Sequence, residues 1–185
     1  MLCDLHKEAA AISSYSGLSA SITLLVQPSK EDVLNALRSC TIAHFAYHGY
    51  ADPIEPTKSA LIVGRETEER LTVKDLDAIN HDHGQIAYLS ACSTAEIQAV
   101  YLADESVHLA STFQLAGFPH VIGTLWGADD NVAVKIASKF YEGLLQNSKS
   151  NMSVAQALHN AVLYFRDESN CTTISRWAPF IHLGC

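Results

Sequence analysis

The chain has 185 residues, of which 48% are hydrophobic and 17% are charged, as expected for one globular domain with a substantial core. Twelve Lys and Arg residues against twenty Asp and Glu residues give a formal net charge of -8. A surface of that sign repels phosphate backbones and anionic membranes, so we expect neither direct nucleic-acid binding nor membrane association.

The cysteines and the first residues of the chain predict a cytoplasmic protein. The number of cysteines is odd, and none has the C-x-x-C spacing of a zinc or redox site, so neither a disulfide framework nor a zinc cluster is expected. Acidic residues stand near Met1, where a secretory signal would need a basic and then an apolar stretch. The five cysteines are Cys3, Cys40, Cys92, Cys171 and Cys185.

Strands and helices alternate along the sequence. Short runs of apolar, β-branched or aromatic residues predict strands at 22–26, 42–47, 60–63, 86–90, 121–126 and 180–183. Three helix starts approach the capping-box pattern, and apolar stripes at helical spacing follow at 132–144 and 154–165. The three starts are Ser29 with Asp32, Thr72 with Asp75, and Ser153 with Gln156.

This alternation predicts an α/β fold in which a mostly parallel sheet is covered by helices on both faces. The polar stretch 64–70 predicts a hairpin, and therefore a small antiparallel element beside the sheet. Residues 106–128 contain no Asp, Glu, Lys or Arg and form a run long enough to cross a bilayer. Gly117 and Pro119 interrupt that run, so we interpret it as a buried helix followed by a buried strand.

Two predicted strands end in residues that can carry chemistry. Strand 42–47 is followed by His48 and Gly49, and strand 86–90 is followed closely by Cys92. Ligands bind beyond the carboxyl ends of parallel strands, so neighbouring strands would bring the imidazole and the thiol to one edge. A Cys and a His suffice for acyl transfer, and the backbone N–H groups of Gly49 and Cys92 could form an oxyanion hole. The alternative is that Cys92 is an inert, buried core residue.

Other histidines do not suggest a metal site. His81 and His83 flank Asp82 in a polar connection with no third ligand indicated, so we expect no metal there. His44 precedes His48 by four residues, and strand alternation predicts that both point to one face. We interpret His44 as packed near the site and not as catalytic.

Successive segments of the chain resemble the motifs of the CHAT domain family in the family's order. The resemblance extends from about Ile22 to the end of the chain. Tyr47 departs from the small residue that relatives often have at that position. The matching segments are AHFAYHG (43–49), LSACST (89–94), FQLAG (113–117), VIGTLW (121–126), Phe140-Tyr141 and WAPFIHLG (177–184).

The resemblance implies a caspase-like three-layer fold and peptide-bond cleavage without a metal or an organic cofactor. It implies that His48 is the general acid and Cys92 the nucleophile. Residues 22–185 would form the peptidase domain, after an N-terminal helical lead-in at 1–21. Family members often carry helical repeats, so the resemblance also implies that this chain is one module of a longer protein.

Asp129 and Asp130 stand where the related peptidases place residues of the substrate pocket. Acidic side chains there would favour Arg or Lys before the scissile bond. The alternative is that Asp129 or Asp130 caps the helix that begins near Asn131.

The sequence therefore predicts a cysteine endopeptidase that acts on protein or peptide substrates and is regulated by helical repeats or by a partner. A catalytically silent interaction or scaffold module is the alternative. A hydrolase of the serine type ranks last, because no G-x-S-x-G elbow follows any predicted strand.

Overall fold

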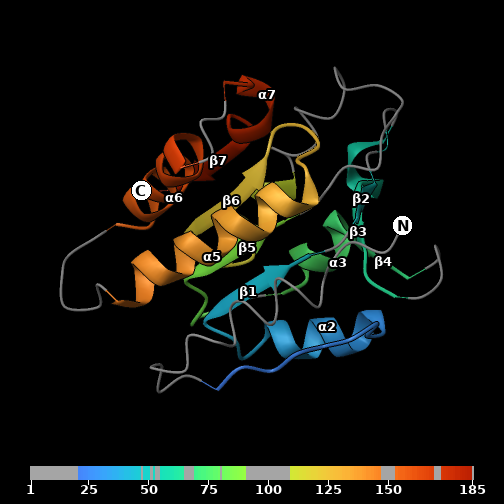
Figure 1. Ribbon diagram of the computed structural model, residues 1–185. Coiled ribbons are helices and arrows are strands. Elements are labelled where there is room, and N and C mark those ends of the chain that lie inside the picture. Colours follow the sequence, from blue (N-terminus) through green and yellow to red (C-terminus); the bar gives the residue numbers. More distant parts are fainter. Residues whose placement is uncertain are drawn as a thin grey trace.

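The computed structural model describes residues 21–46, 48–50, 52, 55–64, 69–79, 81–90, 109–146, 153–168 and 172–184. Its main sheet contains β1 (Ile42–Phe45), β5 (Ile86–Leu89), β6 (His120–Thr124) and β7 (Phe180–Leu183), in the order β1-β5-β6-β7. The first three strands are parallel, and β7 pairs antiparallel with β6 at one edge (Figure 1). The predicted mostly parallel sheet is confirmed.

A second, smaller sheet lies beside the first. It consists of β2 (His48–Tyr50), β3 (Ala60–Ile62) and β4 (Arg70–Thr72), and both of its strand pairs are antiparallel. The antiparallel element predicted around 64–70 is therefore confirmed as the β3–β4 pair. The predicted strand 42–47 ends earlier, at Phe45, and the chain enters the second sheet at His48.

Helices cover both faces of the main sheet. One face packs against α2 (Lys30–Leu37), α3 (Val73–Asp77) and the helical residues 109–115, through a core that includes Phe45, Leu89 and Phe113. The other face packs against α5 (Asp130–Gln146) and α6 (Val154–Glu168), as Figure 1 shows. A 3-10 turn η1 (Pro56–Lys58) and a short helix α7 (Ile174–Trp177) complete these elements. The three layers agree with the predicted caspase-like fold.

The predicted helix starts are present. Ser29 and Thr72 each form a full capping box with Asp32 and Asp75, and the Ser153 hydroxyl accepts a hydrogen bond from the Gln156 N–H. The charge-free stretch 106–128 divides as predicted, since its described part contains the helical residues 109–115 and then β6. Within the described ranges, no helix is both long and apolar enough to cross a membrane.

The strand predicted at 22–26 is wrong. This segment has no regular structure, and Ile22, Leu24 and Val26 expose 52%, 55% and 58% of their surfaces. Only Leu25 packs against the core. An apolar run becomes a strand only when a neighbouring strand satisfies its backbone groups, and none of the described strands pairs with it. The predicted helical lead-in lies outside the described residues apart from residue 21, which is not helical.

Candidate active site

The carboxyl ends of β1 and β5 form the sheet edge where the sequence predicts chemistry. The two strands are parallel neighbours, and Phe45 is aligned with Leu89. One further hydrogen bond, 2.8 Å long, runs from the Ser90 N–H to the carbonyl of Phe45, the last residue of β1, and extends the pairing one residue past the end of β5. The ends of these two strands therefore lie side by side and point in the same direction (Figure 1).

Each predicted dyad residue follows one of these paired strands by the same number of residues in the sequence. His48 comes three residues after Phe45 and Cys92 three residues after Leu89. The backbone of His48 begins β2 and is aligned with Ile62 of β3. The His48 side chain and the whole of Cys92 lie outside the described residues, so the contact between imidazole and thiol stays a prediction.

Gly49 follows His48 within the second sheet. Its backbone is aligned with Leu61 of β3, which is fully buried. The antiparallel pairing therefore fixes the path of the chain immediately after His48. The predicted oxyanion hole also needs Cys92, so that role of Gly49 stays a prediction.

On the other side of β5, the loop after β6 borders the same edge. The Leu125 N–H donates to the Pro179 carbonyl over 2.9 Å, and the Trp126 Nε1–H donates to the Ser175 carbonyl over 3.0 Å. These two bonds attach the loop to the segment that contains α7. The end of β5 thus stands between the end of β1 and a loop anchored by backbone contacts.

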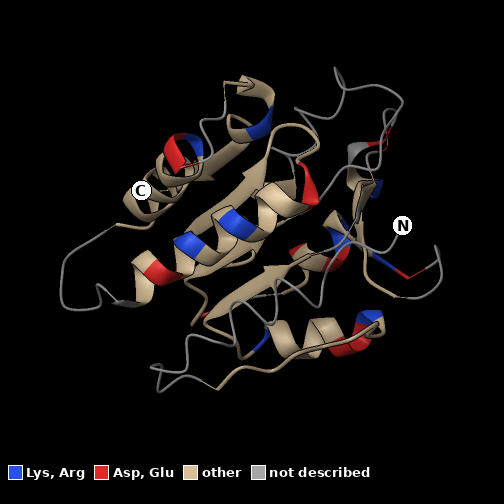
Figure 2. Cartoon of the chain, in the orientation of Figure 1, with Lys and Arg blue, Asp and Glu red and all other residues tan. Residues whose placement is uncertain are grey.

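The two acids of the predicted pocket have different positions. Asp129 caps α5, because its Oδ1 accepts the N–H groups of Asn131 and Val132 at 3.0 and 3.2 Å. Its Oδ2 lies 3.6 Å from Nη2 of Arg176 on α7. Asp130 is the first residue of α5. Figure 2 shows this acidic segment at the start of α5 and the basic residue on α7.

The capping interpretation is therefore confirmed for Asp129, and the pocket interpretation of Asp129 and Asp130 stays a prediction. Arg176 was not among the predicted site residues, because its short helix of four residues, Ile174–Trp177, has no apolar period. The ion pair joins two exposed side chains, so it contributes little to stability. It places a positive charge beside Asp129.

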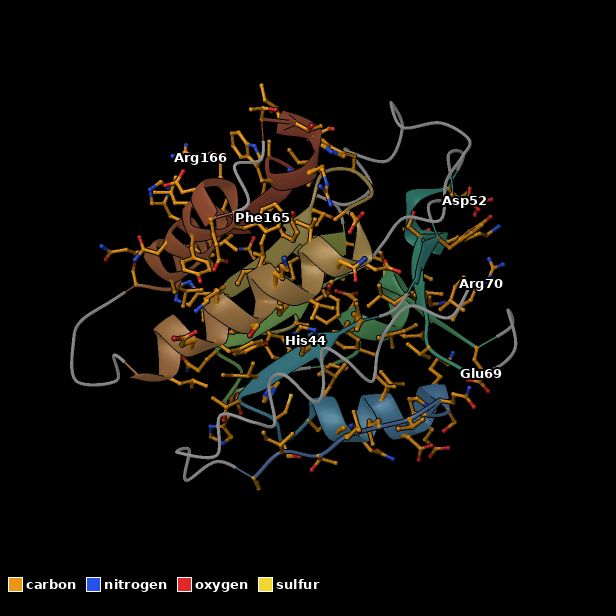
Figure 3. All side chains as sticks on the ribbon, in the orientation of Figure 1. His44, Asp52, Glu69, Arg70, Phe165 and Arg166 are labelled. Carbon is orange, nitrogen blue, oxygen red and sulfur yellow. The ribbon has the colours of Figure 1, made fainter. Side chains whose placement is uncertain are left out.

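His44 lies within β1, on the face of the main sheet that α5 covers. Its Nδ1 is 3.0 Å from the Tyr141 hydroxyl, and its ring stacks on Tyr88 with centroids 4.7 Å apart. Figure 3 labels His44 on β1. His44 is packed among aromatic rings, as expected. Strand alternation cannot be used to infer that His48 faces the same side as His44, because β1 ends at Phe45 and His48 belongs to the other sheet.

His81 is engaged through both ring nitrogens. Its Nδ1 accepts the N–H of His83 at 3.2 Å, so its Nε2 carries the proton and donates to the carbonyl of Cys40. The side chain is also buried, with 4% of its surface exposed. A metal ion at His81 would break these bonds. Among the described residues, no three His, Cys, Asp or Glu side chains gather in a way that could hold a metal.

Cys40 is a free thiol outside the candidate site. Its Sγ–H points to the Leu37 carbonyl at 3.7 Å, and the side chain is partly buried against the core. Burial raises the pKa of the Cys40 thiol, so less of the reactive thiolate is present at neutral pH. This cysteine is an internal reference for the reactivity of Cys92.

Comparison with protein families gives a match to the CHAT domain over residues 2–185. No curated protein matches the chain. The match covers nearly the whole sequence, and the sheet with helices on both faces is consistent with the caspase-like fold of that family. The chain therefore belongs to the CHAT domain family, whose members are related to caspase-like cysteine peptidases.

Proposed function

We propose that this chain is a cysteine endopeptidase in which Cys92 is the nucleophile and His48 the general acid. The observation that supports this most directly is the pairing of β1 with β5. Phe45 is aligned with Leu89, and each precedes one dyad residue by three positions. Two segments that leave one sheet edge in register can bring an imidazole and a thiol together.

The reaction needs only these groups and water. The Cys92 thiolate attacks the carbonyl carbon of the scissile peptide bond, and the carbonyl oxygen takes the negative charge. Backbone N–H groups of Gly49 and Cys92 would stabilise that oxygen. As the C–N bond breaks, the His48 imidazolium gives its proton to the leaving amine, and water then hydrolyses the thioester.

The dyad is tested by labelling with a peptide acyloxymethyl ketone, followed by mass spectrometry of the modified peptide. We expect the label on Cys92, and at least about a 100-fold slower reaction in His48→Ala, because the neutral thiol is a poor nucleophile. Cys92→Ala should lose labelling and at least about 1,000-fold of any peptide hydrolysis.

Cys40→Ser is the matched control for that experiment. Removal of this partly buried thiol should leave labelling and hydrolysis unchanged, because its raised pKa keeps it protonated. Equal labelling of Cys92 in the parent protein and in His48→Ala would refute the dyad. Absence of labelling in every variant would instead favour the catalytically silent scaffold.

The proposed substrate is a protein with Arg or Lys before the scissile bond, bound at Asp130. We expect Asp130→Ala to lower kcat/KM for basic peptides by at least about tenfold relative to alanine peptides, since a charged pair at a partly buried site is worth over 1 kcal/mol. Asp129→Asn is the control, because Asn keeps the cap of α5 and removes only a charge already paired with Arg176.

An Asp130→Ala variant that retains the parent protein's preference for basic over alanine peptides would exclude this pocket.

We further propose that the peptidase works in the cytoplasm as one module of a longer protein, under the control of helical repeats or a partner. A longer natural chain that cleaves its target only after binding such a partner would support that regulation.

A further inference from the structure

Two histidines face each other far from the candidate active site. The antiparallel register aligns Ile122 of β6 with His182 of β7, so the side chains of His182, Ile122 and His120 leave the same face of the sheet. His120 and His182 are diagonal neighbours on that face. They are 62 residues apart in sequence, and both are partly buried.

Their ring nitrogens stand at a distance that suits two ligands of one metal ion. Nδ1 of His120 lies 3.1 Å from Nε2 of His182, and the ring centroids are 5.3 Å apart. Imidazole binds Zn²⁺ at about 2.0–2.1 Å, so two such ligands in tetrahedral geometry lie about 3.3 Å from each other. A small opening of the pair would therefore admit an ion between the nitrogens.

A third possible donor, the Pro119 carbonyl oxygen, lies next to Gly184 beside the two rings. A Cβ built on Gly184 would lie 2.4 Å from the Pro119 carbonyl oxygen, 2.9 Å from His120 Nδ1 and 3.2 Å from His182 Nε2. Two imidazole nitrogens and one carbonyl oxygen thus lie close together around Gly184, where a side chain would clash with them. Gly184 also has a φ of 146°, which L side chains rarely adopt.

We propose that His120, His182 and the Pro119 carbonyl bind a divalent transition-metal ion such as Zn²⁺, with water as the remaining ligand. His120 is the first residue of β6, so the ion would sit at the end of the sheet opposite the candidate active site. Its role would be structural: it would attach the antiparallel edge strand β7 to β6.

Titration of the 185-residue chain with zinc chloride in a non-chelating buffer at pH 7.5 tests the proposal. We expect one site per chain that weakens more than about tenfold in His120→Asn and in His182→Asn, since even the loss of a group that only orients a ligand costs 10–100-fold. His159→Asn is the control, because His159 is exposed on α6 and should leave the affinity unchanged.

Equal zinc affinity in the parent protein and all these variants would mean that cysteine thiolates hold the ion, and it would overturn the proposal. The absence of any zinc binding would also overturn it. A second measurement does not depend on whether the variants fold: the electron paramagnetic resonance spectrum of the parent protein loaded with Cu²⁺. Coupling to two imidazole nitrogens is expected. Coupling to one or none would mean that the histidines form a hydrogen bond only.

Discussion

Single residues fix the points where the chain must turn within this fold. Gly117 follows the helical residues 109–115 and has a φ of 110°, and a Cβ there would lie 2.1 Å from the His81 carbonyl oxygen. The neighbouring backbone cannot move away easily, because the His81 N–H donates to the Ala116 carbonyl over 3.1 Å. Glycine at 117 therefore allows the helix to pass directly into β6.

Gly117→Ala should lower the free energy of unfolding by at least about 2 kcal/mol, because the side chain meets both backbone strain and a carbonyl oxygen. Urea denaturation followed by circular dichroism measures this. Gly123→Ala is the matched control, since nothing lies within 4 Å of a Cβ at that position. A similar loss in the free energy of unfolding in the two variants would show that the close approach to the His81 carbonyl does not affect stability.

At the scale of elements, capping boxes define where α2 and α3 begin. The Asp75 carboxylate accepts hydrogen bonds from the N–H and hydroxyl of Thr72 at 2.9 and 2.7 Å. It also forms an ion pair of 3.1 Å with Lys30 Nζ. One side chain therefore caps α3 and joins it to α2 on the same face of the sheet.

These contacts make stability depend on pH. Burial by itself would raise the pKa of Asp75, but the hydrogen bonds from Thr72 and the contact with Lys30 outweigh it and lower the pKa below 3.8. A lowered pKa in the folded state means that the carboxylate stabilises the fold above the unfolded pKa of about 3.9. That contribution is lost as the pH falls through the folded pKa.

Asp75→Asn should therefore lower the free energy of unfolding by about 1 kcal/mol at pH 7, and by less at pH 3, because the protonated carboxyl of the parent protein has already lost the effect. Urea denaturation at the two pH values checks this. Asp82→Asn, at an exposed position, should change stability little at either pH. A difference in the free energy of unfolding between the parent protein and Asp75→Asn that grows towards pH 3 would contradict a stabilising role for the ionised carboxylate.

For the whole molecule, the strand order decides where chemistry can occur. β5 is buried along its whole length and lies between its parallel neighbours β1 and β6, so its carboxyl end lies between the carboxyl ends of these two strands. The proposed nucleophile would stand in the centre, with the imidazole on one side and Asp130 on the other. The histidine pair of β6 and β7 lies at the opposite end of the sheet, so metal and peptide chemistry would not compete.

Local signals were sufficient for many elements. Ser29, Thr72 and Ser153 marked helix starts correctly, because a cap depends on residues only three positions apart. The apolar stripes of α5 and α6 were equally clear, since their period reflects one buried face. Motifs along the chain also indicated the CHAT family, which the family match confirms.

Local signals failed where a partner decides the structure. Residues 22–26 have the composition of a strand, yet they form none, because no described strand pairs with them. Strand 42–47 was predicted as one piece, whereas the chain changes sheets after Phe45. The sequence left open whether Asp129 caps a helix, and only its contacts with the start of α5 and with Arg176 showed that it does.

The sequence alone determined the fold class, most helices and the family, because these depend on periodicity and on short motifs. The tertiary structure alone decided the alignment of β1 with β5 and the meeting of His120 with His182. Both depend on strand register, which is set by packing between segments more than 40 residues apart. No local pattern carries that information.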